Sequence, residues 1–203
     1  MNAGVRLVQT YLHLNGYFSV AELPVIRQSR GGEYREVTDL DLLALRYPRA
    51  EYVVPGGPGT RGDLRTRTDS LLVQNRELVD VIIAEVKEGK ARINDTLRSR
   101  EALQTALRRV GCCPESILDE TVEELRRSGT SELTAEEAGI PTRIRLVAFG
   151  AGASGAREGF EVISLKHVAR FIEEHLDRYH DVLNPADLGG TALGLLHLLR
   201  KLK

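Results

Sequence analysis

The sequence of 203 residues is poor in cysteine, in net charge and in long apolar segments, and each shortage excludes a class of protein. Its two cysteines, Cys112 and Cys113, are neighbours, so they form neither a disulfide framework nor a zinc site of spaced cysteine pairs. We therefore expect a reduced, cytoplasmic setting. The formal net charge is -1, so no overall positive field indicates a nucleic-acid partner. Because no apolar run reaches the length of a membrane span, no membrane partner is expected.

The size and composition of the chain indicate one domain. With 203 residues, 42% of them hydrophobic, the chain is long enough to bury a full core, and no segment repeats at a fixed period. We expect residues 1–203 to form a single domain in which residues 5–163 make the core and residues 164–203 add C-terminal helices. Residues 48–77 form a long connection, and connections of that length are usually functional or disordered.

Hydrophobic periodicity and turn residues predict a chain that mixes helices with strands. Helices are predicted over residues 3–14, from Asn94 or Asp95 to about residue 110, across an acidic segment at 114–138, over 165–179 and from Pro185 to the C-terminus. Strands are predicted over residues 17–28, 33–46, 79–87, 143–149 and 160–163. This order is typical of the α/β class, in which helices cover a central sheet.

The most informative stretch is LVDVIIAEVKEGK at residues 78–90, which begins as a buried strand and ends with charged residues. Alternate residues of a strand share a face. Glu85 and Lys87 are therefore expected to point to one side of the sheet, with Ala84 and Val86 on the other.

The preceding predicted strand also carries paired acids, Asp39 and Asp41, which share a face by the same alternation. Carboxylates in an apolar sheet are costly unless positive charge compensates them, and a divalent cation and a lysine both do so. Mg²⁺ prefers carboxylate oxygens and keeps several waters. A bound metal lowers the pKa of water and stabilises charge on a phosphoryl group in transfer, while a lysine orients the attacking water.

An acid on one strand and Glu-x-Lys on the next, after an N-terminal helix, resembles the pattern of the PD-(D/E)XK, or restriction-endonuclease-like, nuclease superfamily. The similarity is closest to its small resolvase-like members, covers about residues 5–110, and rests on YLHLNGYF at 11–18, DLDLLA at 39–44 and IAEVKEG at 83–89. The resemblance implies a restriction-endonuclease-like fold, with a mixed central sheet flanked by helices. It also implies hydrolysis of phosphodiester bonds in nucleic acid, with DNA expected before RNA and with Mg²⁺ or Mn²⁺ as the cofactor.

The resemblance also implies a role for each residue that matches the pattern. Asp41 matches the metal-binding aspartate, Glu85 the second metal carboxylate and Lys87 the catalytic lysine. Asp39 falls where some members keep another acid that binds the metal. Members often place a glutamine in the helix after the third strand, and Gln104 is the one candidate.

Contacts to the phosphates of a nucleic acid are expected from basic residues of the long connection and of the segment after the Glu-x-Lys strand: Arg61, Arg65, Arg67, Lys90 and Arg92. Such contacts carry affinity but little sequence specificity. A solvated loop is the alternative interpretation of the same arginines.

Two features of the sequence point to other functions. Many members of the superfamily carry a glutamate in the first helix, whereas this sequence has no acid before Glu22. That absence weakens the case for a second metal and favours a catalytically silent relative that binds nucleic acid or protein. The chain also matches GxGxxG at residues 150–155, the fingerprint of a dinucleotide-binding loop. The fingerprint needs a helix directly after it, but a strand is predicted here, so we interpret the segment as a glycine hairpin.

The remaining polar residues are interpreted structurally. The five histidines lack the spacing of zinc ligands, and the cysteine pair lacks a basic partner that would make a nucleophile. The acidic stretch from Glu115 to Glu137 is interpreted as a solvated helix face, with a protein-interaction surface as the alternative. The final GLLHLLRKLK either packs in the core or joins two copies in a homodimer, and the sequence does not separate these.

Overall fold

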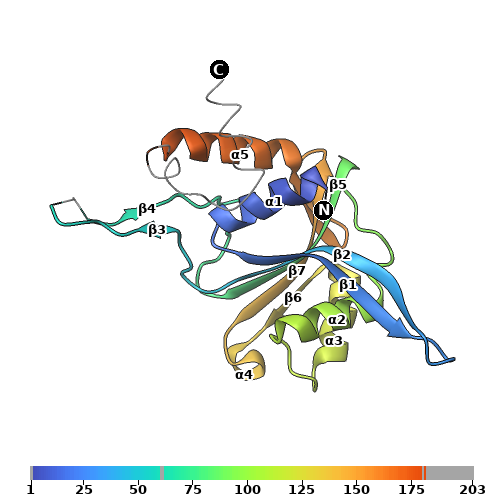
Figure 1. Cartoon of the computed structure of the whole chain (residues 1–203). Helices are drawn as coiled ribbons and strands as arrows, with labels where there is room; N and C mark the ends of the chain where they lie inside the picture. The colour runs from blue at the N-terminus through green and yellow to red at the C-terminus, as the bar shows by residue number, and fades with distance from the viewer. Residues whose placement is uncertain (1, 60–61, 180, 182–203) are drawn as a thin grey trace.

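The computed structural model describes residues 2–59, 62–179 and 181, where the chain forms one mixed sheet with helices on both faces (Figure 1). The strands of the sheet are β1 (Phe18–Gln28), β2 (Tyr34–Arg46), β5 (Val79–Lys90), β6 (Thr130–Leu133), β7 (Thr142–Ala151), β8 (Gly155–Arg157) and β9 (Phe160–Ser164). A separate two-stranded ribbon consists of β3 (Val53–Val54) and β4 (Leu64–Arg65). The helices are α1 (Ala3–Leu14), α2 (Arg100–Val110), α3 (Leu118–Ser128), α4 (Ala135–Ala138) and α5 (Leu165–Arg178). The predicted α/β class with a mixed central sheet is confirmed.

The strands follow the order β1-β2-β5-β7-β9-β8, and β6 also pairs with β7. The pairs β1–β2 and β2–β5 are antiparallel, whereas β5–β7 and β7–β9 are parallel. A tight turn joins β1 to β2, as the sequence predicts. A parallel pair needs a longer crossover, and α2 and α3 lie on the connection from β5 to β7.

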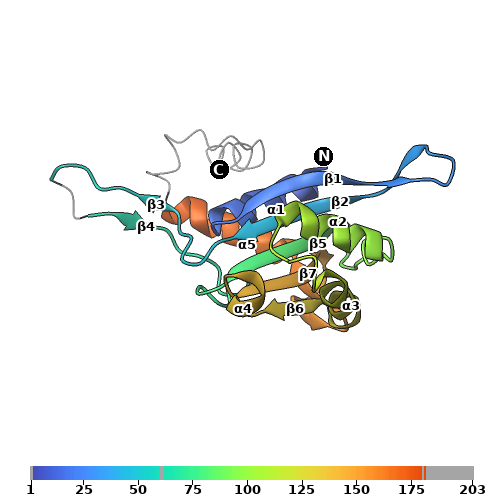
Figure 2. The ribbon, with the colours of Figure 1, turned by 90° about the horizontal axis from the view of Figure 1, so that it is seen from below.

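Two hydrophobic clusters lie on the two faces of the sheet. The first lies beneath α1 and α5 and contains Val8 and Phe171, and the second lies beneath α2 and α3 and contains Leu103. Figures 1 and 2 show these two pairs of helices on opposite sides of the sheet. Alternate residues of β5 enter the two clusters, with Val86 in the first and Ile83 in the second. Strand β5 is therefore buried on both faces, which explains its continuous apolar run.

Strand β2 is longer than its pairing with β5. Only residues 42–46 of β2 pair with residues 80–84 of β5. The first half of β2 extends past β5 together with β1, and the two form a hairpin that projects from the sheet (Figure 2). The β3–β4 ribbon projects in the opposite direction and occupies part of the long connection at 48–77 (Figures 1 and 2).

Helix α2 begins later than the sequence predicts. Arg100 is its first residue, and Ser99 caps it by accepting a hydrogen bond from the Ala102 N–H at 3.2 Å. Asn94, one of the two predicted caps, instead accepts a hydrogen bond from the Leu97 N–H at 2.5 Å, in a turn that precedes the helix. Asparagine and serine are both favoured N-cap residues, so cap preference alone does not decide between Asn94 and Ser99.

The acidic segment at 114–138 is not one continuous helical surface. It contains α3, then strand β6 and the short α4, so a strand of the sheet was missed. Gly129 ends α3 with a φ of +78°. A Cβ atom at Gly129 would lie 2.1 Å from the main-chain oxygen of Gly159, so both the conformation and the space require glycine there.

The GxGxxG segment at 150–155 opens no helix. Strand β7 ends at Ala151, β8 begins at Gly155, and β8 pairs antiparallel with β9. The segment connects strand to strand, as predicted, and the hairpin itself is formed by β8 and β9. A dinucleotide site therefore lacks the helix N-terminus that would hold its pyrophosphate.

Helix α5 is the last helix that the structure describes, and the predicted helix from Pro185 lies outside the described residues. The two alternatives for GLLHLLRKLK, a core element or a contact in a homodimer, therefore stay predictions. None of the helices in the described ranges is both long enough and apolar enough to cross a membrane.

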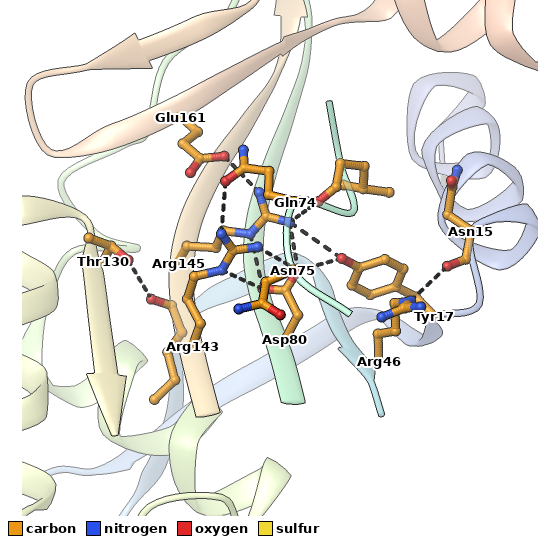
Figure 3. Close-up of polar contacts among 12 residues, drawn as sticks. Asn15, Tyr17, Arg46, Gln74, Asn75, Asp80, Thr130, Arg143, Arg145 and Glu161 are labelled. Atoms are coloured by element: carbon orange, nitrogen blue, oxygen red, sulfur yellow. Dashed lines mark hydrogen bonds and ion pairs between the residues drawn. The ribbon is translucent and has the colours of Figure 1, made fainter. Parts of the chain in front are cut away.

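A buried ionic cluster fixes β5 to β7 and β9 (Figure 3). Asp80, only 1% exposed, accepts hydrogen bonds from the Tyr17 hydroxyl at 2.5 Å and from Arg145 Nη2 at 2.7 Å. Arg143 also pairs with Asp80 at 3.2 Å, and the fully buried Arg145 reaches Glu161 at 2.7 Å. Burial opposes ionisation of Asp80, but the charge and hydrogen bonds of Arg145, with the charge of Arg143, outweigh it and hold the pKa of Asp80 below its usual range.

Candidate functional site

The pairing of strands β2 and β5 ends next to two acidic residues. The last paired residues are Leu42 and Ala84, and the next facing positions are Asp41 and Glu85. Here a side chain takes the place of a main-chain partner, because Asp41 Oδ2 accepts a hydrogen bond from the Val86 N–H at 2.7 Å. The two carboxylates predicted to act together thus occupy facing positions at one end of the β2–β5 ladder.

Glu85 is buried and held by two side chains. It is 2% exposed, and the ammonium of Lys87 forms an ion pair with its Oε1. The side-chain amide of Asn94 donates to both Oε1 and Oε2, each at 2.9 Å. Ala84 and Val86 lie in the cluster beneath α1, so the predicted division of β5 between its two faces is confirmed.

The regular alternation of β2 is interrupted at Asp41. Leu40 packs in the cluster beneath α2 and Leu42 in the cluster beneath α1, although residues two apart should share a face. On β1, the residue facing Asp41 is Glu22, whose φ of +52° is uncommon for any residue but glycine. The alternation that assigned Asp39 and Asp41 to one face therefore does not hold through this point.

The electrostatics of the site are unbalanced. Burial raises the pKa of both Asp41 and Glu85 above their ordinary values, although Lys87 acts in the opposite direction on each. The negative charge of Asp41 further raises the pKa of Glu85. Asp39 and Glu22 add negative charge near Asp41 and further raise its pKa. Asp41 and Glu85 thus bring two carboxylates to one lysine, Lys87, and such an arrangement favours a cation.

The residue that contacts Glu85 from beyond the strand is Asn94 rather than Gln104. Gln104 lies in α2 as predicted, but its side-chain amide donates to Asp119 of α3 at 2.7 Å. Asn94 lies in the segment between β5 and α2, and the sequence marked it only as a helix cap. Its contact with Glu85 could not be read from the sequence, because it depends on how that segment turns back over the strand.

The predicted phosphate-contact residues fall into two groups. Lys90 and Arg92 are exposed and lie at and just after the end of β5, close in the chain to the Glu-x-Lys pair. Arg65 lies in β4, in the ribbon that projects away from the β1–β2 hairpin (Figure 2), and the Arg67 N–H donates to the Tyr179 hydroxyl at 2.9 Å just after that ribbon. There the Arg65 guanidinium already forms an ion pair with Glu51 at 3.0 Å. Arg61 lies outside the described residues.

The chemistry of the donor groups fits a hard divalent cation. Asp41 and Glu85 supply carboxylate oxygens, which are the ligands that Mg²⁺ and Mn²⁺ prefer. Within residues 2–59, 62–179 and 181, no three His, Cys, Asp or Glu side chains are grouped so as to hold a metal ion together. One or two carboxylates completed by water and substrate phosphate are the usual protein contribution to an Mg²⁺ site.

The cysteine pair does not compete with this site. Burial, with the neighbouring Cys113, raises the pKa of the Cys112 thiol to about 11. A reactive cysteine needs a lowered pKa, because the thiolate is the nucleophile. The structural interpretation of the pair is therefore the better one.

Comparison with known proteins assigns no family to the chain. No protein-family model, no curated protein and no solved structure matches it. The functional interpretation accordingly depends on the arrangement of Asp41, Glu85 and Lys87.

Proposed function

We propose that the protein is a metal-dependent nuclease that hydrolyses phosphodiester bonds in nucleic acid, with DNA as the expected substrate. One observation carries the proposal: Asp41 and Glu85 face each other where β2 and β5 part, and Lys87 pairs with Glu85 there. A chance Glu-x-Lys at a strand end would give two solvated side chains. Here the glutamate is buried, and a second acid from the neighbouring strand lies beside it.

The restriction-endonuclease-like fold is part of this proposal. Helix α1, strands β1, β2 and β5, and helix α2 follow one another in the implied order, with the β3–β4 ribbon inserted before β5. The acid lies on the second strand of this set and Glu-x-Lys on the third. This agreement between order and motif supports the proposal more than the short motif does alone.

In the proposed reaction, Asp41 and Glu85 hold an Mg²⁺ or Mn²⁺ ion. The ion, when bound, makes its water more acidic and offsets negative charge on the phosphate. The side chain of Lys87 is 35% exposed while its ammonium contacts Glu85, so this lysine joins the buried glutamate to the solvent-facing surface of the site. We assign to Lys87 the orientation of the attacking water and stabilisation of the charge that develops on the phosphate oxygens. Lys90 and Arg92 are the proposed nearby phosphate contacts.

The decisive experiment is a cleavage assay on labelled single-stranded, duplex and branched DNA, and on RNA, with Mg²⁺, Mn²⁺ or EDTA. Lys87→Ala should lower the cleavage rate about a hundred- to a thousandfold, as loss of one preorganised charged group typically does. Asp41→Asn should abolish cleavage, because it removes a metal ligand's charge but keeps an oxygen that accepts from the Val86 N–H. Lys166→Ala, which changes an exposed lysine on α5, is the matched control and should cleave normally.

A second function is favoured by one observation, the absence of any acidic residue in α1. In that case the chain is a catalytically silent module that binds nucleic acid or protein. Nucleic-acid affinity, measured on the same variants, separates the two functions. Affinity that holds in Lys87→Ala while cleavage falls supports the enzyme. Equal binding by the wild type and the variants, with no metal-dependent cleavage by any of them, would refute it and support the module.

A further inference from the structure

Asn94 is held at both ends of its side chain. At one end Oδ1 accepts a hydrogen bond from the Leu97 N–H at 2.5 Å, which closes a turn before α2. At the other end Nδ2 lies 2.9 Å from each carboxylate oxygen of Glu85. The turn before α2 thus fixes the side chain of Asn94, and the amide of Asn94 then fixes both carboxylate oxygens of Glu85.

The turn alone does not explain asparagine at this position. Aspartate and serine also cap such turns, because each offers a side-chain oxygen to a main-chain N–H. An aspartate, however, would place a second carboxylate oxygen beside Glu85, and a serine is too short to reach it. A side chain that accepts at one end and donates at the other satisfies both contacts.

We infer that Asn94 is the positioning residue for Glu85 in the proposed nuclease. This inference rests on the proposed function, since it concerns the same site. A carboxylate has about four positions for accepting hydrogen bonds or binding a cation. In the described structure Asn94 takes one on each oxygen and Lys87 takes another on Oε1, which leaves Oε2 a position for a cation. Asn94 thereby sets which oxygen Glu85 presents and in which orientation.

The test uses Asn94→Ser, which keeps an oxygen for the Leu97 N–H but removes the contact with Glu85. The matched control is Asn75→Ser, because Asn75 is exposed and its Oδ1 accepts from the Glu77 N–H at 2.8 Å in a comparable turn. Both variants are titrated with Mn²⁺ alone by calorimetry, in the absence of nucleic acid. Removing a residue that orients a metal ligand typically weakens metal binding about ten- to a hundredfold. We expect that loss for Asn94→Ser and wild-type affinity for Asn75→Ser.

A second measurement is the dependence of the cleavage rate on Mn²⁺ concentration. This dependence should be unaltered in Asn94→Ser if Asn94 has a purely structural role. Raising Mn²⁺ should restore the cleavage rate of Asn94→Ser towards that of the wild type, because the catalytic lysine is intact. The same excess should leave Lys87→Ala slow. If Asn94→Ser binds Mn²⁺ as tightly as the wild type, Asn94 serves the turn only and the inference is wrong while the proposed function stands. If the wild type itself neither binds Mn²⁺ nor cleaves, the proposed function fails and the inference with it.

Discussion

Replacing Asp80 by asparagine should cost much of the stability of the protein. The substitution conserves shape, so no cavity forms. The cost comes from the lost charge and from an amide NH2 that replaces one of two oxygens, each of which accepts hydrogen bonds from Arg145. Arg145 is fully buried and would keep Glu161 as its carboxylate partner, while Arg143, 8% exposed, would lose its ion pair with Asp80. Removing one partner of a buried ion pair costs about 3–5 kcal/mol, because the other charge remains buried. Most domains are stable by only about 5–15 kcal/mol, so this loss is large.

Urea unfolding followed by circular dichroism measures the effect. Asp80→Asn should lower the midpoint while the dependence of the unfolding free energy on urea stays unchanged. Asp119→Asn is the control, since Asp119 pairs with Arg100 at 3.2 Å but its side chain is 68% exposed. Exposed pairs contribute roughly 0–1 kcal/mol, so the control should be nearly neutral. If both variants lose the same small amount of unfolding free energy, the buried cluster around Asp80 does not stabilise the packing of β5 beside β7 in the way described.

Three further outcomes are expected. Burial lowers the pKa of His175 from 6.5 to about 4, so between pH 6.5 and 4 the unfolded chain binds a proton that the folded chain does not. The free energy of unfolding should therefore fall by about 3 kcal/mol as the pH is lowered through that range. His175→Asn should remove this pH dependence, which urea unfolding at a series of pH values measures. Glu22→Gln should lower the pKa of Asp41, because it removes a nearby negative charge, and a carboxyl carbon NMR titration that shows no change would contradict this. Gly129→Ala should destabilise the protein by roughly 2–5 kcal/mol through strain and overlap, whereas Gly139→Ala, also at a φ of +78° but with open space around it, should cost about 1–2 kcal/mol in the same assay.

The strands and the positions of the candidate site residues on them were predictable where local pattern decides structure. The apolar run before Glu85 is a strand because every other residue enters one of two cores, and the same alternation correctly separates Glu85 and Lys87 from Val86. It fails at Asp41, where the left-handed conformation of Glu22 on the neighbouring strand accompanies a change of face. No local pattern reports such an interruption.

Other features depend on residues far apart in the chain. The alternating Arg143 and Arg145 of β7 resemble a solvated face in sequence, yet both are buried because Asp80 and Glu161 arrive from neighbouring strands. Gln104 lies in the predicted helix, but Asp119 of α3 binds its amide. These partners could be identified only from the folded chain.

The hydrogen bond between Asp41 and the Val86 N–H links a main-chain amide to the state of the site. In most strands, protection of an amide from hydrogen exchange depends on the opening of its ladder. Here the acceptor is a side-chain oxygen of a proposed metal ligand, 2.7 Å away. The exchange rate of this single amide hydrogen therefore reports how Asp41 is oriented. In 15N-labelled protein, it offers a way to follow occupation of the proposed metal site by NMR without any substrate.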